Sequence, residues 1–353
     1  MSRRLHSISK LRPKRFALAV CGALLGVARV FAADEEPGKV LAAIGQQVQA
    51  IYHGSGSAVV RIEATDANGR LAGTGFFIDP NGTLYTSYSV GGESQDITVH
   101  FRGAQHPATR LVSDQRSGIA ILKIDAETPF LTFGKARDLA IATPVIALGY
   151  PRELPLTPSF GIVGGFDLKY LGRYFATTHI RANVPVQRGE GGAPLLNLQG
   201  EVVGILISML DAGSASFVLP IEAAEKVRMD FTRFREPHPG WIGVQVKTAD
   251  AAVAGSTAQI DEVTADAPAQ KAGLLPGDVL LQIGARKIAA AEDVLDASFF
   301  LTADDDVLVR ISRGGAEMEM KLQPADPPNA ARALLPQIGS INDGLPVRVR
   351  AVR

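Results

Sequence analysis

Residues 189–205 carry the sequence GEGGAPLLNLQGEVVGI. Its first glycines permit a tight turn, because glycine adopts backbone angles that other residues avoid. A short apolar strand limited by Pro194 comes next, and a hairpin follows it. Chance rarely supplies a glycine turn, a strand and a hairpin in this fixed order, so the stretch is the most specific motif of the chain.

Short β-rich segments do extend outward from this stretch at regular intervals. Residues 79–82 (DPNG) are typical of the turns between them, because Pro favours the second turn position and Asn-Gly tolerates positive φ. Many short strands with almost no long helix predict a sandwich or a barrel. One amphipathic helix, Val40–Ile51, precedes them. The expected strands are Ala58–Ala64, Gly75–Ile78, Thr83–Ser87, Ile97–Phe101, Ile119–Ile124, Val145–Leu148, Ile180–Val184 and Val202–Ile207.

A second unit spans residues 240–323. A predicted helix at Glu222–Arg233 and a linker at residues 235–239 precede it, and the two prolines of the linker cannot continue the helix. Helical stretches are expected near Pro268–Ala272 and Ala291–Phe300. The expected strands are Ile242–Val246, Gln259–Val263, Val279–Ile283, Val307–Ser312 and Glu317–Leu322.

Composition narrows the class of protein. The chain has 353 residues, of which 46% are hydrophobic and 20% charged, which suits two or three folded domains and excludes a disordered chain. A single cysteine excludes an internal disulfide, and no Cys/His spacing of a metal site occurs. We expect no metal and no cofactor. Lys+Arg and Asp+Glu are balanced at 36 each, which gives no indication of nucleic-acid binding.

Residues 1–32 have the three-part layout of a secretory signal peptide. Seven basic residues and no acid accompany an apolar run over Phe16–Val27, and residues 30–32 (VFA) form the cleavage box. The run is shorter than the roughly 20 residues that span a bilayer, although an uncleaved anchor that tethers the protein is an alternative. Lipidation at Cys21 is the weaker option. We expect export to the periplasm of a Gram-negative bacterium. Cleavage after Ala32 would leave 29 basic against 36 acidic residues, a net charge of −7, and no cysteine.

Three passages resemble the trypsin-like serine proteases of the HtrA type: residues 73–79 (GTGFFID), 113–125 (SDQRSGIAILKID) and 189–205. Because the second unit resembles the PDZ domain that follows the protease in that family, the resemblance covers residues 38–323. It implies a mostly β fold, in which a trypsin-like double β-barrel precedes a PDZ domain, an α+β unit built on a partly open barrel. The implied divisions are a signal peptide (1–32), an N-terminal helical segment (33–54), a trypsin-like domain (55–234), a linker (235–239), a PDZ domain (240–323) and a Pro-rich to basic tail (324–353).

Each passage should supply one member of the family's catalytic triad, and none does. Ser89 stands where the family has the histidine base, Gly118 replaces the aspartate that orients it, and Gly191 replaces the nucleophilic serine. The chemistry needs a nucleophile, an imidazole and a carboxylate in hydrogen-bond reach. No Ser, Thr or Cys lies between Val184 and Ser208. The resemblance therefore implies a pseudoprotease without catalytic residues.

Other interpretations stay open. An active serine endopeptidase of protein quality control is the main alternative, because the fold alone suggests it. A shifted triad using Asp114 is weaker, since triad geometry is strict. His100 and His106 lack the spacing of metal ligands. The isolated histidines are expected to be structural or solvent-exposed: His53, His179 and His238.

The turn at residues 189–192 keeps part of the family's apparatus. The backbone N–H groups of Gly189 and Gly191 correspond to the oxyanion hole of active relatives and are able to hold an anion or a peptide carbonyl. The simpler interpretation is that the glycines only make a tight turn. Glu190 beside them would repel a carboxylate ligand.

A PDZ domain binds an extended peptide at a sheet edge and captures its terminal carboxylate with loop N–H groups. The resemblance places this loop at Trp241–Val244. There, Gly243 lets a ligand approach the backbone, and Ile242 and Val244 line the pocket. Trp241 is assigned equally to the pocket and to the domain junction. The residues expected on the opposite wall of the groove are Val294, Leu295, Ser298 and Phe299.

Charge indicates the kind of partner. Residues 240–323 hold seven basic and thirteen acidic residues, a net charge of −6, which favours neutral or basic peptides. We expect an exported, non-catalytic protein that binds peptides, protein C-termini or unfolded proteins in a regulatory or chaperone-like role. A homotrimer and co-assembly with an active relative are both open, and nucleic acid is not expected. Residues 347–352 alternate like a strand within a basic tail, which suggests pairing with an acidic face or sheet edge of the same chain or a neighbour.

Overall fold

The computed structural model of the chain describes residues 37–170, 173–210 and 214–328. The expected signal peptide, its cleavage and lipidation positions, and the tail beyond residue 328 lie outside the described residues. The first described element is helix α2 (Pro37–Ser55), which is longer at both ends than expected. Within the described ranges, no helix combines the length and the apolar character that crossing a membrane requires.

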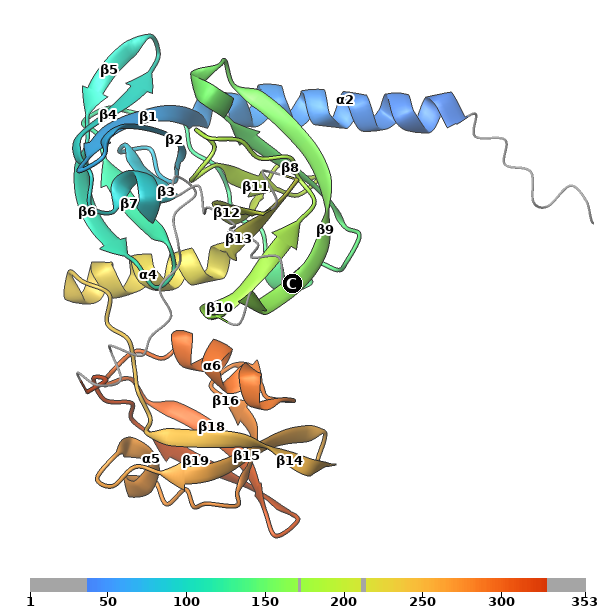
Figure 1. Cartoon of the computed structure of the whole chain (residues 1–353), viewed down its shortest axis with the longest axis vertical. Helices are drawn as coiled ribbons and strands as arrows, with labels where there is room; N and C mark the ends of the chain where they lie inside the picture. Colours follow the sequence, from blue (N-terminus) through green and yellow to red (C-terminus); the bar gives the residue numbers. More distant parts are fainter. Residues whose placement is uncertain (1–36, 171–172, 211–213, 329–353) are drawn as a thin grey trace, which may run out of the picture. The chain divides into compact units, whose positions relative to one another are not determined.

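Seven antiparallel strands form the first sheet, in the order β5-β4-β1-β2-β3-β7-β6 (Figure 1). The 3₁₀ turn η1 (Gly56–Ala58) leads into this sheet, and the one-turn helix α3 (Tyr88–Gly91) follows β3 without a loop. The strands are β1 (Val59–Asp66), β2 (Gly69–Phe77), β3 (Thr83–Ser87), β4 (Gln95–Phe101), β5 (Ala104–Pro107), β6 (Thr109–Asp114) and β7 (Ile119–Lys123).

Six further strands close into a barrel, in the order β10-β13-β12-β11-β8-β9. Leu195 pairs with Ala147 on one side and with Gly204 on the other, so the short strand β11 lies inside the barrel wall and holds the preceding glycine turn in place. Helix α4 (Ile221–Phe234) follows the last strand. The other elements are η2 (Ala136–Asp138), β8 (Pro144–Gly149), η3 (Pro151–Glu153), β9 (Thr157–Tyr170), β10 (Arg173–Ala182), β11 (Pro194–Leu196), β12 (Val202–Leu210) and β13 (Ala215–Pro220).

One hydrophobic cluster draws its residues from both sheets. Phe76 and Tyr85 of the first sheet and Ile146 and Ile205 of the barrel are fully buried in it. Each such side chain contributes about 1.5–3 kcal/mol of burial free energy. This shared core fixes the position of the loops where the two sheets meet.

The C-terminal domain is a sheet in the order β14-β15-β16-β18-β19, with β17 beside β16. Helices α5 and α6 accompany it, and its own core includes Ile260, Leu280 and Val309. The elements are β14 (Val244–Val253), β15 (Ser256–Val263), α5 (Pro268–Lys271), β16 (Val279–Ile283), β17 (Arg286–Lys287), α6 (Ala291–Phe299), β18 (Val307–Arg313) and β19 (Ala316–Leu322).

The mostly β fold class is confirmed, with differences in detail. One of the two N-terminal sheets closes as a barrel, and the other is a seven-stranded sheet. The long strand β9 was not expected, because its outward residues Phe160, Ile162 and Phe166 are apolar and about 40% exposed, so the alternation that marks a half-buried strand is missing. Strand β14 begins two residues later than expected, because Gly243 has a φ of 79° and ends the extended conformation there.

Candidate functional site

Ser89 lies on α3, directly after the buried strand β3. The backbone N–H of Tyr88 donates a 2.7 Å hydrogen bond to the carbonyl oxygen of Gly118. The hydroxyl oxygens of Ser89 and Ser87 are 2.9 Å apart and share a hydrogen bond. A hydroxyl in this position exchanges hydrogen bonds but does not take up a proton near neutral pH.

Gly118 closes the turn between β6 and β7. Its φ of 77° lies in the left-handed region, where a residue with a side chain is strained. Its N–H donates to the carbonyl oxygen of Asp114 at 3.0 Å. A Cβ at Gly118 would approach Ile207 of β12 at 3.4 Å, so this position faces the barrel.

The glycine turn before β11 is anchored on β2. The N–H of Thr74 donates to the carbonyl oxygen of Gly191 at 2.9 Å, and its Oγ1 donates to that of Gly189 at 2.7 Å. Thr74 is fully buried, so both bonds are shielded from water. One threonine thus holds the backbone of both glycines.

Gly192 brings the same turn against β3. Its φ is 89°, and a Cβ there would fall 2.4 Å from Thr86 Oγ1 and 2.6 Å from the backbone nitrogen of Ser87. Only glycine fits in this space. The contacts at Tyr88 and at Gly192 therefore bring the segments that carry Ser89, Gly118 and Gly191 together at the junction of the two sheets.

Two backbone donors of the turn are free. Among the described residues, the N–H groups of Gly189 and Gly191 donate to no protein acceptor. Glu190 is turned inward with 2% exposure, and its Oε2 accepts a 2.6 Å hydrogen bond from the N–H of Gln187. Burial raises the pKa of the Glu190 carboxyl above its ordinary value. The Glu190 side chain therefore braces the turn from inside.

The described histidines are engaged elsewhere. His100 Nε2 lies 3.1 Å from Glu63, and His238 stacks on Phe234. His179 is fully buried, and burial lowers its pKa to about 4. The part of the chain that the structure describes contains no group of three His, Cys, Asp or Glu side chains arranged to hold a metal ion.

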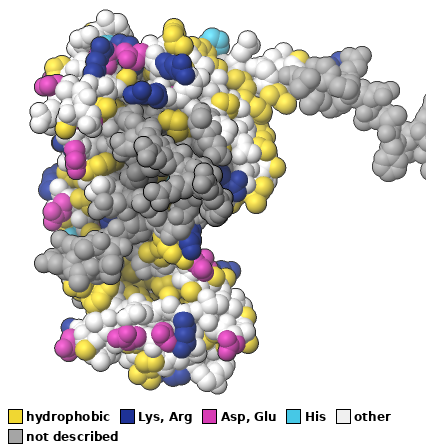
Figure 2. Space-filling model, in the orientation of Figure 1, with side chains coloured by type: hydrophobic (Ala, Val, Ile, Leu, Met, Phe, Trp, Pro, Cys, Tyr) yellow, Lys and Arg dark blue, Asp and Glu magenta, His cyan; other side chains and the backbone are white. Residues whose placement is uncertain are grey.

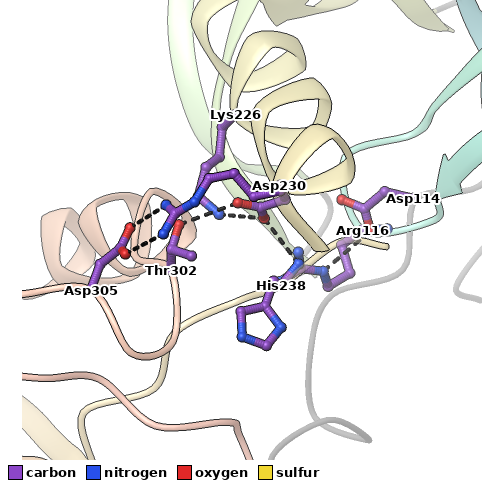
Figure 3. A network of polar contacts seen from close by, with 8 residues as sticks. Asp114, Arg116, Lys226, Asp230, His238, Thr302 and Asp305 are labelled. Atoms are coloured by element: carbon purple, nitrogen blue, oxygen red, sulfur yellow. Dashed lines mark hydrogen bonds and ion pairs between the residues drawn. The ribbon is translucent and has the colours of Figure 1, made fainter. Parts of the chain in front are cut away.

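Asp114, considered above for a shifted triad, is held by Arg116. Asp114 Oδ1 accepts from the backbone N–H and from Nε of Arg116, both at 3.2 Å, while its buried Oδ2 has no partner. Figure 3 shows this pair beside the buried ion pair of α4, in which Lys226 Nζ lies 2.5 Å from Asp230 Oδ2. The N–H of His238 donates to the same Oδ2 at 3.0 Å. Asp114 therefore makes structural contacts with Arg116.

The loop expected to capture a carboxylate precedes the edge strand β14. The carbonyl oxygens of Ile242 and Gly243 accept from Ala269 and Thr264, each at 2.9 Å, which fixes the loop. Within the described ranges, the N–H groups of Ile242 and Gly243 donate to no protein acceptor. Val244, half-buried against the domain core, begins the strand beside them.

Trp241 contacts both the loop and the chain that leaves the domain. Its N–H and C=O form a pair of hydrogen bonds with Ala325, at 2.8 and 2.9 Å. A Cβ on Gly243 would lie 3.0 Å from the indole ring, so the ring covers the loop.

The residues expected on the groove wall occupy one side of α6. Val294 is buried in the domain core, and Leu295 and Ser298 are half-buried. The Ser298 hydroxyl donates to the carbonyl oxygen of Val294 at 2.6 Å, so it is already partnered. Phe299 departs from the expectation, because it packs into the core cluster of the N-terminal domain.

Sequence reasoning missed Asp296. One of its carboxylate oxygens accepts from Thr177 Oγ1 at 2.6 Å and from the N–H of Thr178 at 2.7 Å, both on β10. The other oxygen accepts from Arg286 at 2.5 Å. The only signal was its place three residues before Phe299 on the same helix face. Asp296 thus joins α6 to the barrel.

The comparisons with known proteins agree with this architecture. Residues 73–205 match the model of a trypsin-like peptidase domain, and residues 240–323 match that of a PDZ domain. The fold is therefore a trypsin-like β-barrel domain followed by a PDZ domain. In sequence, the chain is similar to HtrA/DegP-like proteins.

Two relatives are named probable periplasmic serine endoprotease DegP-like. The one from Hahella chejuensis is 28% identical over 295 residues, which covers 79% of this chain and 63% of the relative. The one from Pseudomonas fluorescens is 29% identical over 263 residues, which covers 71% of this chain and 55% of the relative. This chain thus spans less than two thirds of their length.

Solved structures share the fold. One titled HtrA-type protease AlgW with tripeptide superposes with a TM-score of 0.67 at 22% identity and covers 80% of this chain and 97% of that one. The serine endoprotease from Yersinia pestis has a TM-score of 0.57 at 22% identity and covers 80% of this chain and 98% of that one.

Proposed function

We propose that the chain is an exported, non-catalytic HtrA-like protein that binds peptides through its PDZ domain. One observation carries the proposal: the segments expected to hold the triad meet at the junction of the two sheets, but they present Ser89, Gly118 and Gly191. No imidazole accepts a proton there, no carboxylate orients one, and no hydroxyl occupies the nucleophile's position. Proteolysis by the triad mechanism needs these groups together.

The scaffold around the site supports a binding role. The free N–H groups of Gly189 and Gly191 are aimed by contacts with Thr74, and such donors hold a carbonyl oxygen whether or not a nucleophile is present. Export is part of the proposal, since the matched relatives are named periplasmic. The proposal also includes a linker at residues 235–239 between the trypsin-like domain and the PDZ domain.

Peptide binding rests on the PDZ loop. The N–H groups of Ile242 and Gly243 lie side by side without a protein acceptor in the described chain, next to the edge strand β14. A terminal carboxylate suits two such donors, and the strand edge suits an extended peptide. One solved neighbour is titled with a tripeptide. Figure 2 shows acidic side chains distributed over the PDZ domain on the face in view, and with a net charge of −6 the domain favours neutral or basic peptides.

A second candidate, an active serine endopeptidase, is favoured by the names of the relatives. Incubation of the purified protein with unfolded casein separates the two. We expect intact casein after prolonged incubation, with an active HtrA-type protease as the positive control. Cleavage that follows the protein through successive purification steps would establish the endopeptidase.

A binding measurement tests the rest of the proposal. Fluorescent peptides with free C-termini, one basic and one acidic, are titrated with the protein, and C-terminally amidated versions serve as matched controls. We expect the basic free-carboxylate peptide to bind best and amidation to weaken binding. Equal binding of all four peptides would contradict capture of the carboxylate by the loop.

A further inference from the structure

The PDZ sheet ends in an uncovered edge. Strand β19 pairs with β18 over its full length, and no other described strand pairs with it. An open edge presents a row of unpaired N–H and C=O groups, and proteins commonly cover such edges or occupy them with another strand. Every residue of β19 except Met320 and Leu322 is exposed.

The core face of the sheet continues onto this edge without being covered. Met318 stands opposite Ile311, and Met320 stands opposite Val309. Ile311 and Val309 are fully buried, so both methionines lie on the core face. Met318 is nevertheless 41% exposed. A further strand beside β19 would bury this apolar surface.

The opposite face of β19 carries two glutamates, Glu317 and Glu319, whose carboxylates form no ion pair among the described residues. Glu317 and Glu319 are exposed, and within the described ranges no ion pair or hydrogen bond engages either carboxylate. Arg310 is the cross-strand neighbour of Glu319 but makes no ion pair with it. Lys321, the next residue on the same face of β19, forms an ion pair with Asp306, with 2.7 Å between Nζ and Oδ2.

One segment of the same chain has the complementary pattern. Residues 347–353 read VRVRAVR. In an extended strand, Val347, Val349 and Ala351 would share one face, and Arg348 and Arg350 the other. The spacing of two between the arginines equals the spacing of the two free glutamates of β19. One register therefore places valines beside the methionines and arginines beside the glutamates.

Chain length allows this contact. Residues 329–346 separate the last described residue from Val347, and 18 extended residues reach roughly 60 Å. Seven-residue β19 is about 23 Å long. The chain leaves the domain at Ala325, three residues after β19 ends.

We propose that the open edge of β19 is the docking site of residues 347–352 of the same chain, which add to the sheet as a sixth long strand. The other edge strand, β14, is the poorer match. Lys247 lies in its exposed row and already neutralises Asp261 at 2.6 Å, so an arginine-bearing strand would meet a lysine there.

Hydrogen exchange of the full chain tests the proposal. In the variant Arg348→Glu/Arg350→Glu, the amides of residues 316–322 are expected to exchange about tenfold faster than in the parent. Arg332→Glu, a charge change in the tail outside the segment, is the control and is expected to leave them unchanged. Adding Glu317→Arg/Glu319→Arg to the double variant is expected to restore slow exchange, because the pairs are then re-formed with reversed charge.

Three outcomes would overturn the proposal. Unchanged exchange of residues 316–322 in the double variant would show that the tail does not cover β19. Faster exchange confined to β14 would place the tail in the peptide groove instead. Protection of β19 that disappears on dilution would assign the strand to a neighbouring copy and not to the same chain.

Discussion

The backbone N–H of Tyr88 donates a 2.7 Å hydrogen bond to the carbonyl oxygen of Gly118. This bond joins the helix that carries Ser89 to the turn before β7, and Thr74 joins the glycine turn to the same region. These hydrogen bonds therefore hold together the segments that were expected to carry a catalytic triad. The proposed loss of catalysis rests on the side chains of these segments, because Ser89, Gly118 and Gly191 stand at the expected triad positions.

The glycine turn should tolerate no side chain at Gly192. A Cβ there would lie 2.3 Å from the carbonyl oxygen of Thr74, with φ at 89°. Crowding and left-handed strain together predict that Gly192→Ala lowers the free energy of unfolding by about 3 kcal/mol. Gly103→Ala is the matched control, because Gly103 has φ 75° and no atom within 4 Å of its Cβ position; its loss should be about 1 kcal/mol. Equal losses in urea denaturation would contradict the packing account.

The loop at Trp241–Val244 should likewise tolerate no side chain at Gly243. A Cβ there would lie 2.3 Å from Ala267 Cβ, so Gly243→Ala must shift the loop and its free N–H groups. We expect peptide affinity, measured by fluorescence anisotropy, to fall about tenfold or more. Gly255→Ala is the control at the far end of β14, with φ 85° and open space around it. Parent-like affinity in Gly243→Ala would remove the loop from the binding site.

Burial of His179 predicts a pH dependence. Its pKa is about 4 in the folded protein and about 6.5 in an unfolded chain. The unfolded chain therefore takes up the proton first as the pH falls, and stability is lost between pH 6.5 and 4. The full shift corresponds to about 3 kcal/mol. His179→Gln should lose less stability over this range than the parent, whereas exposed His53→Gln should follow the parent. Parallel curves for His179→Gln and the parent would show that His179 is not the cause.

The sequence predicts the secondary structure better than it predicts the contacts between side chains. Alternating segments and turns located most strands, since periodicity reports burial directly. Strand β9 was not predicted, because its exposed face is apolar and the polar–apolar alternation is missing. The triad positions are predicted from motifs alone. The segments that carry them are held together by individual hydrogen bonds, such as that of the Thr74 N–H with the carbonyl oxygen of Gly191, which the sequence does not reveal. The role of Asp296 could not be predicted from the sequence, because the hydrogen-bond donors of a buried carboxylate are known only from the fold.

Those donors make Asp296 a test of the packing of α6 on the barrel. Asp296→Ala would leave Thr177 Oγ1 and the N–H of Thr178 without their acceptor and would free Arg286. We expect a loss of about 3 kcal/mol in the free energy of unfolding. Asp250→Ala, on the exposed face of β14, is the control and should change stability by less than about 0.5 kcal/mol. A parent-like Asp296→Ala would mean that water replaces these contacts without cost.

Labelling with a fluorophosphonate serine probe shows whether the trypsin-like domain contains a reactive serine. The purified protein is incubated with excess probe, its intact mass is recorded, and an active HtrA-type protease is labelled in parallel. Because Gly191 offers no hydroxyl and Ser89 no imidazole, we expect an unchanged mass for this protein and full labelling of the control. A stoichiometric mass increase that maps to a serine of the trypsin-like domain would identify an active enzyme and overturn the proposed non-catalytic function.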